Sequence, residues 1–250
     1  MSANDIRSVD TDIRRVRDDN RGVDTLTPRT LIGLDDPYLL TDPTARELFA
    51  GVPWRRFAVI GDSTAAGTGD PSPGHENLSW ADRLARWFRS AHPDTEYLNT
   101  GRVGATIPEV RAEQLGALRA FRPDLVHITC GGNDLMRRDG DVGAVERDLD
   151  ALCAEAAATG ARLSMFTLAD AFTGPLRPLR PRFAGFAESV RRVAARHDAI
   201  LTEFWRHPAR LRQDWLSADS IHLTMAGQAV VAAELAKSFA RHADSRHGGE

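Results

Sequence analysis

Lysine is almost missing from this chain, because all of its 32 basic residues except Lys237 are arginine. A single lysine near the C-terminus argues against a phosphate-binding loop ending in G-K-[ST] and against Schiff-base chemistry. Cysteine is nearly as scarce. Cys130 and Cys153 are too few for a four-cysteine zinc site, and their apolar surroundings predict two buried, reduced thiols. The eight histidines include no H-E-x-x-H motif and no pair at metal-ligand spacing.

Long apolar runs are also missing. The longest weakly polar stretch, residues 226–236, is interrupted by Gln228 and Glu234, so no segment is expected to span a membrane. Residues 1–22 are charged throughout and lack the apolar core of a secretory signal, which predicts a cytoplasmic protein. The net charge of −3 and the pI near 6.2 are unlike the strongly basic footprint of a nucleic-acid-binding domain. No nucleic-acid partner is therefore expected.

The composition changes near residue 50. The first two dozen residues alternate Asp and Arg with few large apolar side chains, which is typical of a charged, solvated arm. Four prolines within residues 25–55 predict an irregular segment that crosses a domain surface. Residues 1–50 are therefore expected to form an N-terminal arm and irregular lead-in, and residues 51–250 to form one folded domain.

From Arg56 onward, short apolar runs alternate with stretches of helical periodicity. The predicted strands cover residues 57–60, 97–98, 125–130, 163–168 and 199–201. One predicted helix, residues 106–121, opens with a capping box of Thr106 and Glu109 and has Pro108 in its first turn. Strands that are apolar throughout, each followed by a helix, indicate a parallel sheet covered on both faces. The fold class is therefore predicted to be α/β with about five parallel strands.

Four polar blocks stand near the ends of these predicted strands. They are Gly-Asp-Ser-Thr at 61–64, Asn-Thr-Gly-Arg-Val-Gly at 99–104, Gly-Gly-Asn-Asp at 131–134 and Asp-Ser-Ile-His at 219–222. Because ligands of an open parallel sheet bind at the carboxyl ends of its strands, the four blocks are expected to meet at one edge. Each block alone is an ordinary turn or cap sequence.

Together, the blocks contain every part that serine acyl transfer needs. Ser63 offers a hydroxyl nucleophile, His222 a base, and Asp219 a carboxylate three residues before that base, which can hold its tautomer. Glycines and Asn133 add hydrogen-bond donors for a developing oxyanion.

The order and spacing of these blocks resemble the SGNH, or GDSL-type, hydrolase superfamily, over residues 57–239. The resemblance implies a three-layer α/β/α sandwich of flavodoxin-like topology. It also implies that Ser63 is the nucleophile, His222 the general base and then acid, and Asp219 the residue that orients His222. The oxyanion hole would consist of the N–H groups of Ser63 and Gly104 and the side-chain amide of Asn133.

Some residues depart from that family pattern, and two other motifs have to be compared with it. Thr64 stands where the signature has leucine, and Arg102 stands where smaller residues are common, either solvated or facing an anionic substrate group. The α/β-hydrolase elbow G-x-S-x-G is one glycine short here, because Ala65 follows the serine at its last position. A dinucleotide site is disfavoured because Pro71 and Pro73 follow the Gly-x-Gly at 67–69.

The resemblance implies a serine esterase that cleaves a carboxylic ester through an acyl-enzyme. Its partner would be a small-molecule ester, and neither a metal nor an organic cofactor is implied. Two alternatives are an acyltransferase that hands the acyl group to an alcohol or sugar, and a non-catalytic binding domain. Two long loops, residues 65–77 and 170–182, are expected beside the site, as lids or substrate walls or as plain solvated connections.

Overall fold

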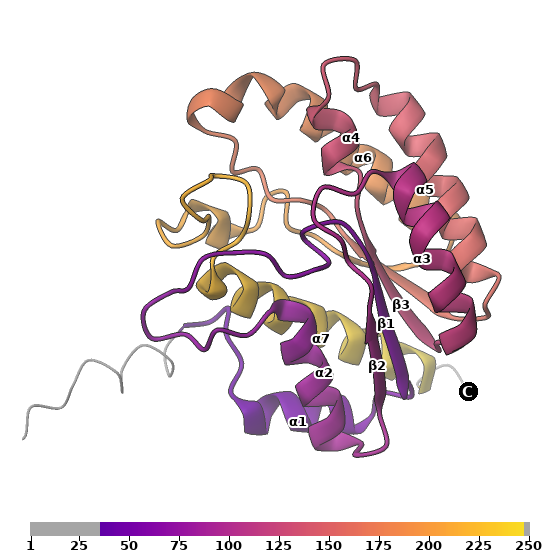
Figure 1. Ribbon diagram of the computed structural model, residues 1–250. Helices are drawn as coiled ribbons and strands as arrows, with labels where there is room; N and C mark the ends of the chain where they lie inside the picture. Colours follow the sequence, from indigo (N-terminus) through magenta and orange to yellow (C-terminus); the bar gives the residue numbers. More distant parts are fainter. Residues whose placement is uncertain (1–35, 248–250) are drawn as a thin grey trace, which may run out of the picture.

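The computed structural model describes residues 36–247, in which five parallel strands form one sheet between two layers of helices (Figure 1). The strands are β1 (Arg56–Gly61), β2 (Glu96–Asn99), β3 (Leu125–Thr129), β4 (Arg162–Phe166) and β5 (Ile200–Thr202). The α-helices are α1 (Asp42–Ala50), α2 (Trp80–Ala91), α3 (Ile107–Phe121), α4 (Gly132–Met136), α5 (Val142–Ala157), α6 (Arg180–Arg196) and α7 (Met225–His247). Two 3-10 helices are η2 (Gly174–Leu179) and η3 (Pro208–Leu211). The predicted three-layer α/β fold with five parallel strands is confirmed.

The inner strands β1, β3 and β4 are buried on both faces, as their continuous apolar pattern predicts, whereas the edge strand β2 is partly exposed. In β1, Phe57 and Val59 pack with α1, α2 and α7, whereas Ala58 and Ile60 pack with α3, α5 and α6. Successive side chains of a strand point to opposite faces, so a strand with a core on each side has to be apolar at every position. Figure 1 shows the same two helical layers on either side of the sheet.

The strand order β2-β1-β3-β4-β5 places the site within the sheet. The chain runs from β1 outward to β2 and then returns to add β3 on the other side of β1. This is the flavodoxin-like order, in which the switch point between β1 and β3 opens a crevice at the carboxyl edge. In the part of the chain that the structure describes, no helix is long and apolar enough to cross a membrane.

The expectation of an irregular segment over residues 25–55 is wrong for α1. Thr41 caps this helix by accepting a hydrogen bond from the N–H of Thr44, and Pro43 lies in the first turn, where proline needs no N–H partner. Phe49 is fully buried and contacts Phe88 of α2 with ring centroids 4.3 Å apart. Pro43 therefore marks a helix start instead of an irregular path. Residues 1–35 lie outside the described residues, and the division of the chain at residue 50 stays a prediction.

Candidate active site

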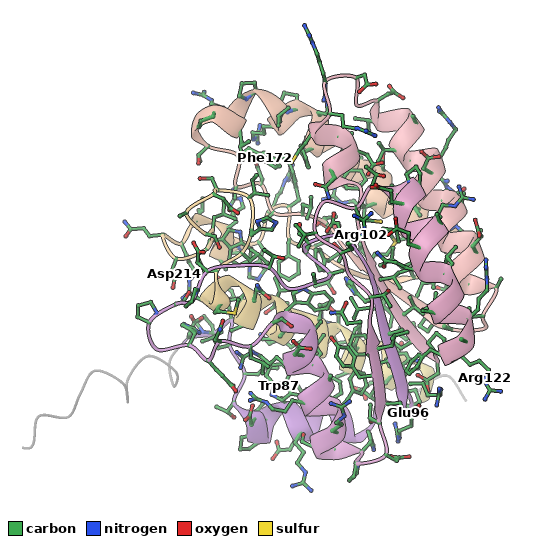
Figure 2. The ribbon with its side chains drawn as sticks, viewed as in Figure 1. Trp87, Glu96, Arg102, Arg122, Phe172 and Asp214 are labelled. Carbon is green, nitrogen blue, oxygen red and sulfur yellow. The ribbon has the colours of Figure 1, made fainter. Side chains whose placement is uncertain are left out.

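The polar blocks meet at the carboxyl edge of the sheet. Ser63 follows β1, and His222 lies in the long connection between β5 and α7, yet a hydrogen bond joins their side chains. Phe172, Arg102 and Asp214, which are labelled in Figure 2, come from the segments after β4, β2 and β5 around this edge. The prediction that distant blocks converge here is therefore confirmed for the serine and the histidine.

A sharp turn at the end of β1 presents Ser63. Gly61 has φ +145°, and a Cβ at this position would lie 1.9 Å from the backbone oxygen of Thr129 on β3, so only glycine fits. The side chain of Gln114 on α3 binds the same glycine twice, accepting from its N–H at 2.9 Å and donating to its carbonyl at 2.8 Å. The turn is thus fixed by contacts with both β3 and α3. Ser63 is nearly buried, with 7% exposure.

Ser63, His222 and Asp219 form one hydrogen-bonded line. Nε2 of His222 lies 2.8 Å from Oγ of Ser63, and Nδ1 lies 2.6 Å from Oδ2 of Asp219. A carboxylate accepts from Nδ1–H, which leaves Nε2 unprotonated and able to take a proton from the serine hydroxyl. The geometry is therefore that of a nucleophile, a general base and an orienting carboxylate.

Asp219 also shapes the loop that carries His222. Its Oδ1 accepts from the backbone N–H groups of Ile221 at 2.9 Å and of His222 at 3.0 Å. Ser220, which directly follows Asp219, takes a left-handed conformation with φ +60°. Burial alone would raise the pKa of Asp219, but the hydrogen bonds from His222 and the two N–H groups lower it below its ordinary value. The carboxylate is thus ionised when it faces the imidazole.

The loop of residues 65–77 supports the loop that carries His222 through hydrogen bonds of Asp70. The N–H of Asp70 donates to Oγ of Ser217 at 2.8 Å, Oδ2 of Asp70 accepts from the N–H of Ala218 at 2.9 Å, and its carbonyl accepts from the N–H of Met225. Within the described chain, Thr68 is the residue of this loop that lines the site cavity. The sequence did not predict that this loop supports the loop of His222.

Three N–H groups of the polar blocks form no hydrogen bond in the described residues, so they are available to an oxygen atom of a ligand. In the described part of the chain, no hydrogen bond uses the N–H of Ser63 or the N–H of Gly104. The side chain of Asn133 donates one N–H to the carbonyl of Ala105 at 2.9 Å, which leaves its second N–H. Gly104 has φ +79°, so the turn after β2 needs a glycine there.

Asp134 is a supporting residue that the sequence analysis did not single out. Its carboxylate accepts from the N–H of Ile107, the first residue of α3, at 3.1 Å, as an acidic cap of a helix start does. Together with the bond between Asn133 and Ala105, it ties the start of α4 to the loop that carries Gly104. Ile107 and Asp134 are 27 positions apart, so no local sequence pattern predicts this hydrogen bond.

Asp62, directly before Ser63, is a buried carboxyl group. Burial raises its pKa from 3.8 to about 6, although its Oδ1 accepts from the N–H of Thr64 at 2.9 Å, which opposes the shift. The folded protein therefore holds a proton on this group at pH values where the unfolded chain has lost it. Ionising Asp62 costs stability as the pH rises from about 4 to above 6.

The variant Asp62→Asn is expected to lose this pH dependence. An asparagine keeps an oxygen that accepts from the N–H of Thr64 but carries no charge, so the variant gains up to about 3 kcal/mol relative to the wild type between pH 4 and pH 7. Denaturant unfolding at a series of pH values measures the difference. Parallel stability curves for the two proteins would contradict the buried, ionisable state of Asp62.

Ser63, Asn133 and His222 line one cavity with an empty volume of about 1020 Å³, counting the space open to solvent. Gly104 does not belong to its lining. Most of the wall consists of apolar side chains from α2, β4, η2, α6 and α7. The loop of residues 170–182 is more than a plain solvated connection, because its residues Phe172 and Leu176 line the cavity.

Arg102 does not line the cavity. Its guanidinium pairs with Glu113 at 2.8 Å and Glu109 at 3.4 Å, both on α3, so the idea that it receives an anionic substrate group has no support. In the described residues, no cluster of three or more His, Cys, Asp or Glu could hold a metal ion.

Solved structures of other hydrolases share this fold. LAE5, an alpha/beta hydrolase enzyme from the metagenome of Lake Arreo, Spain, is 25% identical with a TM-score of 0.60, and the match covers 74% of this chain and 94% of that chain. Axe2, an acetylxylan esterase from Geobacillus stearothermophilus, is 19% identical with a TM-score of 0.61, over 74% and 94% of the two chains. The psychrotrophic esterase EstA from Pseudoalteromonas sp. is 20% identical with a TM-score of 0.61, over 76% and 99%.

A comparison with curated proteins found no match. The model of one family, described as the GDSL-like lipase/acylhydrolase family, matches residues 59–230. The matched region begins within β1 and ends within α7, so it contains Ser63, Asn133, His222 and the loop that carries Gly104. The chain belongs to the GDSL-like lipase/acylhydrolase family, whose members are esterases and acylhydrolases.

Proposed function

We propose that this protein is a serine hydrolase that cleaves a carboxylic ester through an acyl-enzyme on Ser63. The observation that carries the proposal is the line of hydrogen bonds from Ser63 Oγ through the His222 ring to Asp219, at 2.8 Å and 2.6 Å. Family membership supports ester hydrolysis in general. Free donors at Ser63, Gly104 and Asn133 support the same chemistry.

The reaction follows from these positions. His222 Nε2 takes the proton of Ser63 as Oγ attacks the ester carbonyl, and the carbonyl oxygen becomes an anion that the three donors bind. His222 then gives the proton to the leaving alcohol as the C–O bond breaks, which leaves an acyl group on Ser63. Water attacks that ester in the same way, with His222 as base and then acid, and releases the carboxylic acid.

The Axe2 structures support these roles. Solved forms of that enzyme are described as catalytic mutants in which a serine, an aspartate or a histidine is replaced by alanine. Its aspartate and histidine stand three positions apart, the spacing of Asp219 and His222 in this chain.

A fluorophosphonate probe tests the proposal. The probe needs an activated hydroxyl, because the serine oxygen displaces fluoride and forms a bond to phosphorus. We expect one adduct per chain, which peptide mass spectrometry should place on Ser63. Labelling of another residue, or no labelling of the folded protein, would contradict the assignment.

We also propose that the catalytic unit lies within residues 51–250, since all the site residues fall between 62 and 222. Deletion of residues 1–24 is expected to leave kcat nearly unchanged, because this segment has the composition of a solvated arm. The deletion stops well before α1, whose Phe49 belongs to the core. Steady-state kinetics on the shortened, folded protein measure the effect, and a collapse of kcat would assign the segment to the site.

A further inference from the structure

The cavity beside Ser63 extends from Ser63, Asn133 and His222 to a group of buried aromatic side chains. Its inner wall consists of Trp80, Phe166, Phe204 and Trp215, each at most 8% exposed. Successive rings of this wall lie 5.9, 5.7 and 6.4 Å apart between centroids, so they form a continuous aromatic surface. Such a wall gains free energy only from an apolar ligand that displaces water from it.

Several of the polar atoms along this inner wall already have partners. Nε1 of Trp80 donates to the carbonyl of Thr64 at 2.8 Å, and the amide of Gln228 binds Trp80 and Gly67. The hydroxyl of Thr167 accepts from the N–H groups of Phe204 and Trp205. A sugar or another polar group placed against this wall would meet mostly aromatic ring faces and would lose hydrogen bonds to water.

A roof segment, residues 171–183, covers the cavity from the side of η2. Phe172, Leu176 and Leu179 of this segment line the cavity, whereas Arg177 between the leucines is exposed. The side facing the cavity is therefore apolar, and the side facing solvent is polar.

Two arginines hold the roof segment in place. Arg180 binds both carboxylate oxygens of Asp170, at 2.8 and 2.6 Å. Nη1 of Arg182 donates to the carbonyls of Leu135 and Arg137, at 2.6 and 2.9 Å. Those carbonyls stand at the end of α4, the helix that carries Asn133, so the roof is tied to one of the oxyanion donors.

The chemistry of the reaction says which part of an ester enters this space. During attack, the carbonyl oxygen has to face the donors at Ser63, Gly104 and Asn133, and the leaving oxygen has to face Nε2 of His222. The remaining substituent of the carbonyl carbon is the α-carbon of the acyl chain. With both oxygens placed in this way, the acyl chain is the part of the ester left to contact the aromatic wall and the roof segment.

We propose that the preferred substrates of this protein are esters whose acyl group is a long apolar chain, of hexanoyl length or more, held between the aromatic wall and the roof segment. The proposal rests on the proposed function, because it needs Ser63 as the acylated residue. An acetyl group, with one methyl beyond the carbonyl, would leave both surfaces in contact with water. The specificity then differs from that of an acetyl esterase with the same fold.

A series of p-nitrophenyl esters from acetyl to decanoyl, each kept at monomeric concentrations, tests the proposal. Each methylene removed from water is worth about a fourfold increase in kcat/KM, so octanoyl is expected to exceed acetyl by at least about 100-fold. An acetyl ester hydrolysed as well as the octanoyl ester would overturn the proposal but leave the esterase function intact. Failure to cleave any ester in a Ser63-dependent way would instead remove the proposed function.

The variant Leu176→Asn tests the roof, with Leu211→Asn as its matched control. Both leucines lie in 3-10 helices, but Leu211 is 75% exposed and does not line the cavity. Leu176→Asn is expected to lower kcat/KM for the octanoyl ester about tenfold and for the acetyl ester less than twofold. Leu211→Asn should change neither by more than twofold. An equal loss on both esters in Leu176→Asn, or no loss, would contradict the role of the roof, and Leu179→Asn repeats the test if the first variant fails to fold.

Discussion

Replacing Ser63 by alanine is expected to lower kcat by about 10⁴–10⁶-fold and to abolish labelling by the fluorophosphonate probe. Without the hydroxyl, no acyl-enzyme forms, and His222 has no nucleophile to deprotonate. The fold should be unaffected, because the turn around Ser63 is held by Gly61, Gln114 and Asp62 through bonds that do not use the serine side chain.

Kinetics with an activated aryl ester and thermal unfolding of the purified variant provide the measurement. Ser90→Ala is the matched control, because Ser90 is exposed on α2 and its hydroxyl donates to the carbonyl of Trp87, far from the site in the fold. The control should keep the wild-type kcat. Turnover of Ser63→Ala within tenfold of the wild type would refute the nucleophile assignment.

The second large effect concerns Asn133. Its free side-chain N–H is proposed to bind the oxygen of the tetrahedral intermediate, where the negative charge is larger than on the ester carbonyl. Asn133→Ala should therefore reduce kcat by about 10²–10³-fold with little change in KM. Asn133→Asp should be at least as damaging, because it places a negative charge where an anion has to form.

The two variants also separate binding from catalysis. Both lose the hydrogen bond to the carbonyl of Ala105, so a purely structural role would affect them alike and would appear in thermal unfolding. A rise in KM alone would mean that Asn133 only holds the substrate. Full activity in both variants would remove it from the oxyanion hole.

Most of the secondary structure was predictable because its signals are local. The alternation of apolar strands with periodic helices yields the sheet, and Thr106 with Glu109 and Pro108 marks the start of α3 correctly. The helix α1 was missed because proline was interpreted as a sign of irregular structure, although Pro43 follows the N-cap Thr41 and occupies the first turn. The helix is buried because it packs against α2 and α7, and no local sequence pattern predicts these contacts.

The sequence by itself determined the chemistry available to this protein. Ser63 next to a strand end, Asn133 after two glycines, and Asp219 three residues before His222 are short patterns whose backbone turns are set locally. Only the tertiary structure decided how those groups are supported and what surrounds them. Asp70 reaches Ala218 across 148 positions, and the cavity walls come from elements between α2 and α7. Such contacts depend on how the helices pack on the sheet, so a single sequence carries no periodic signal for them.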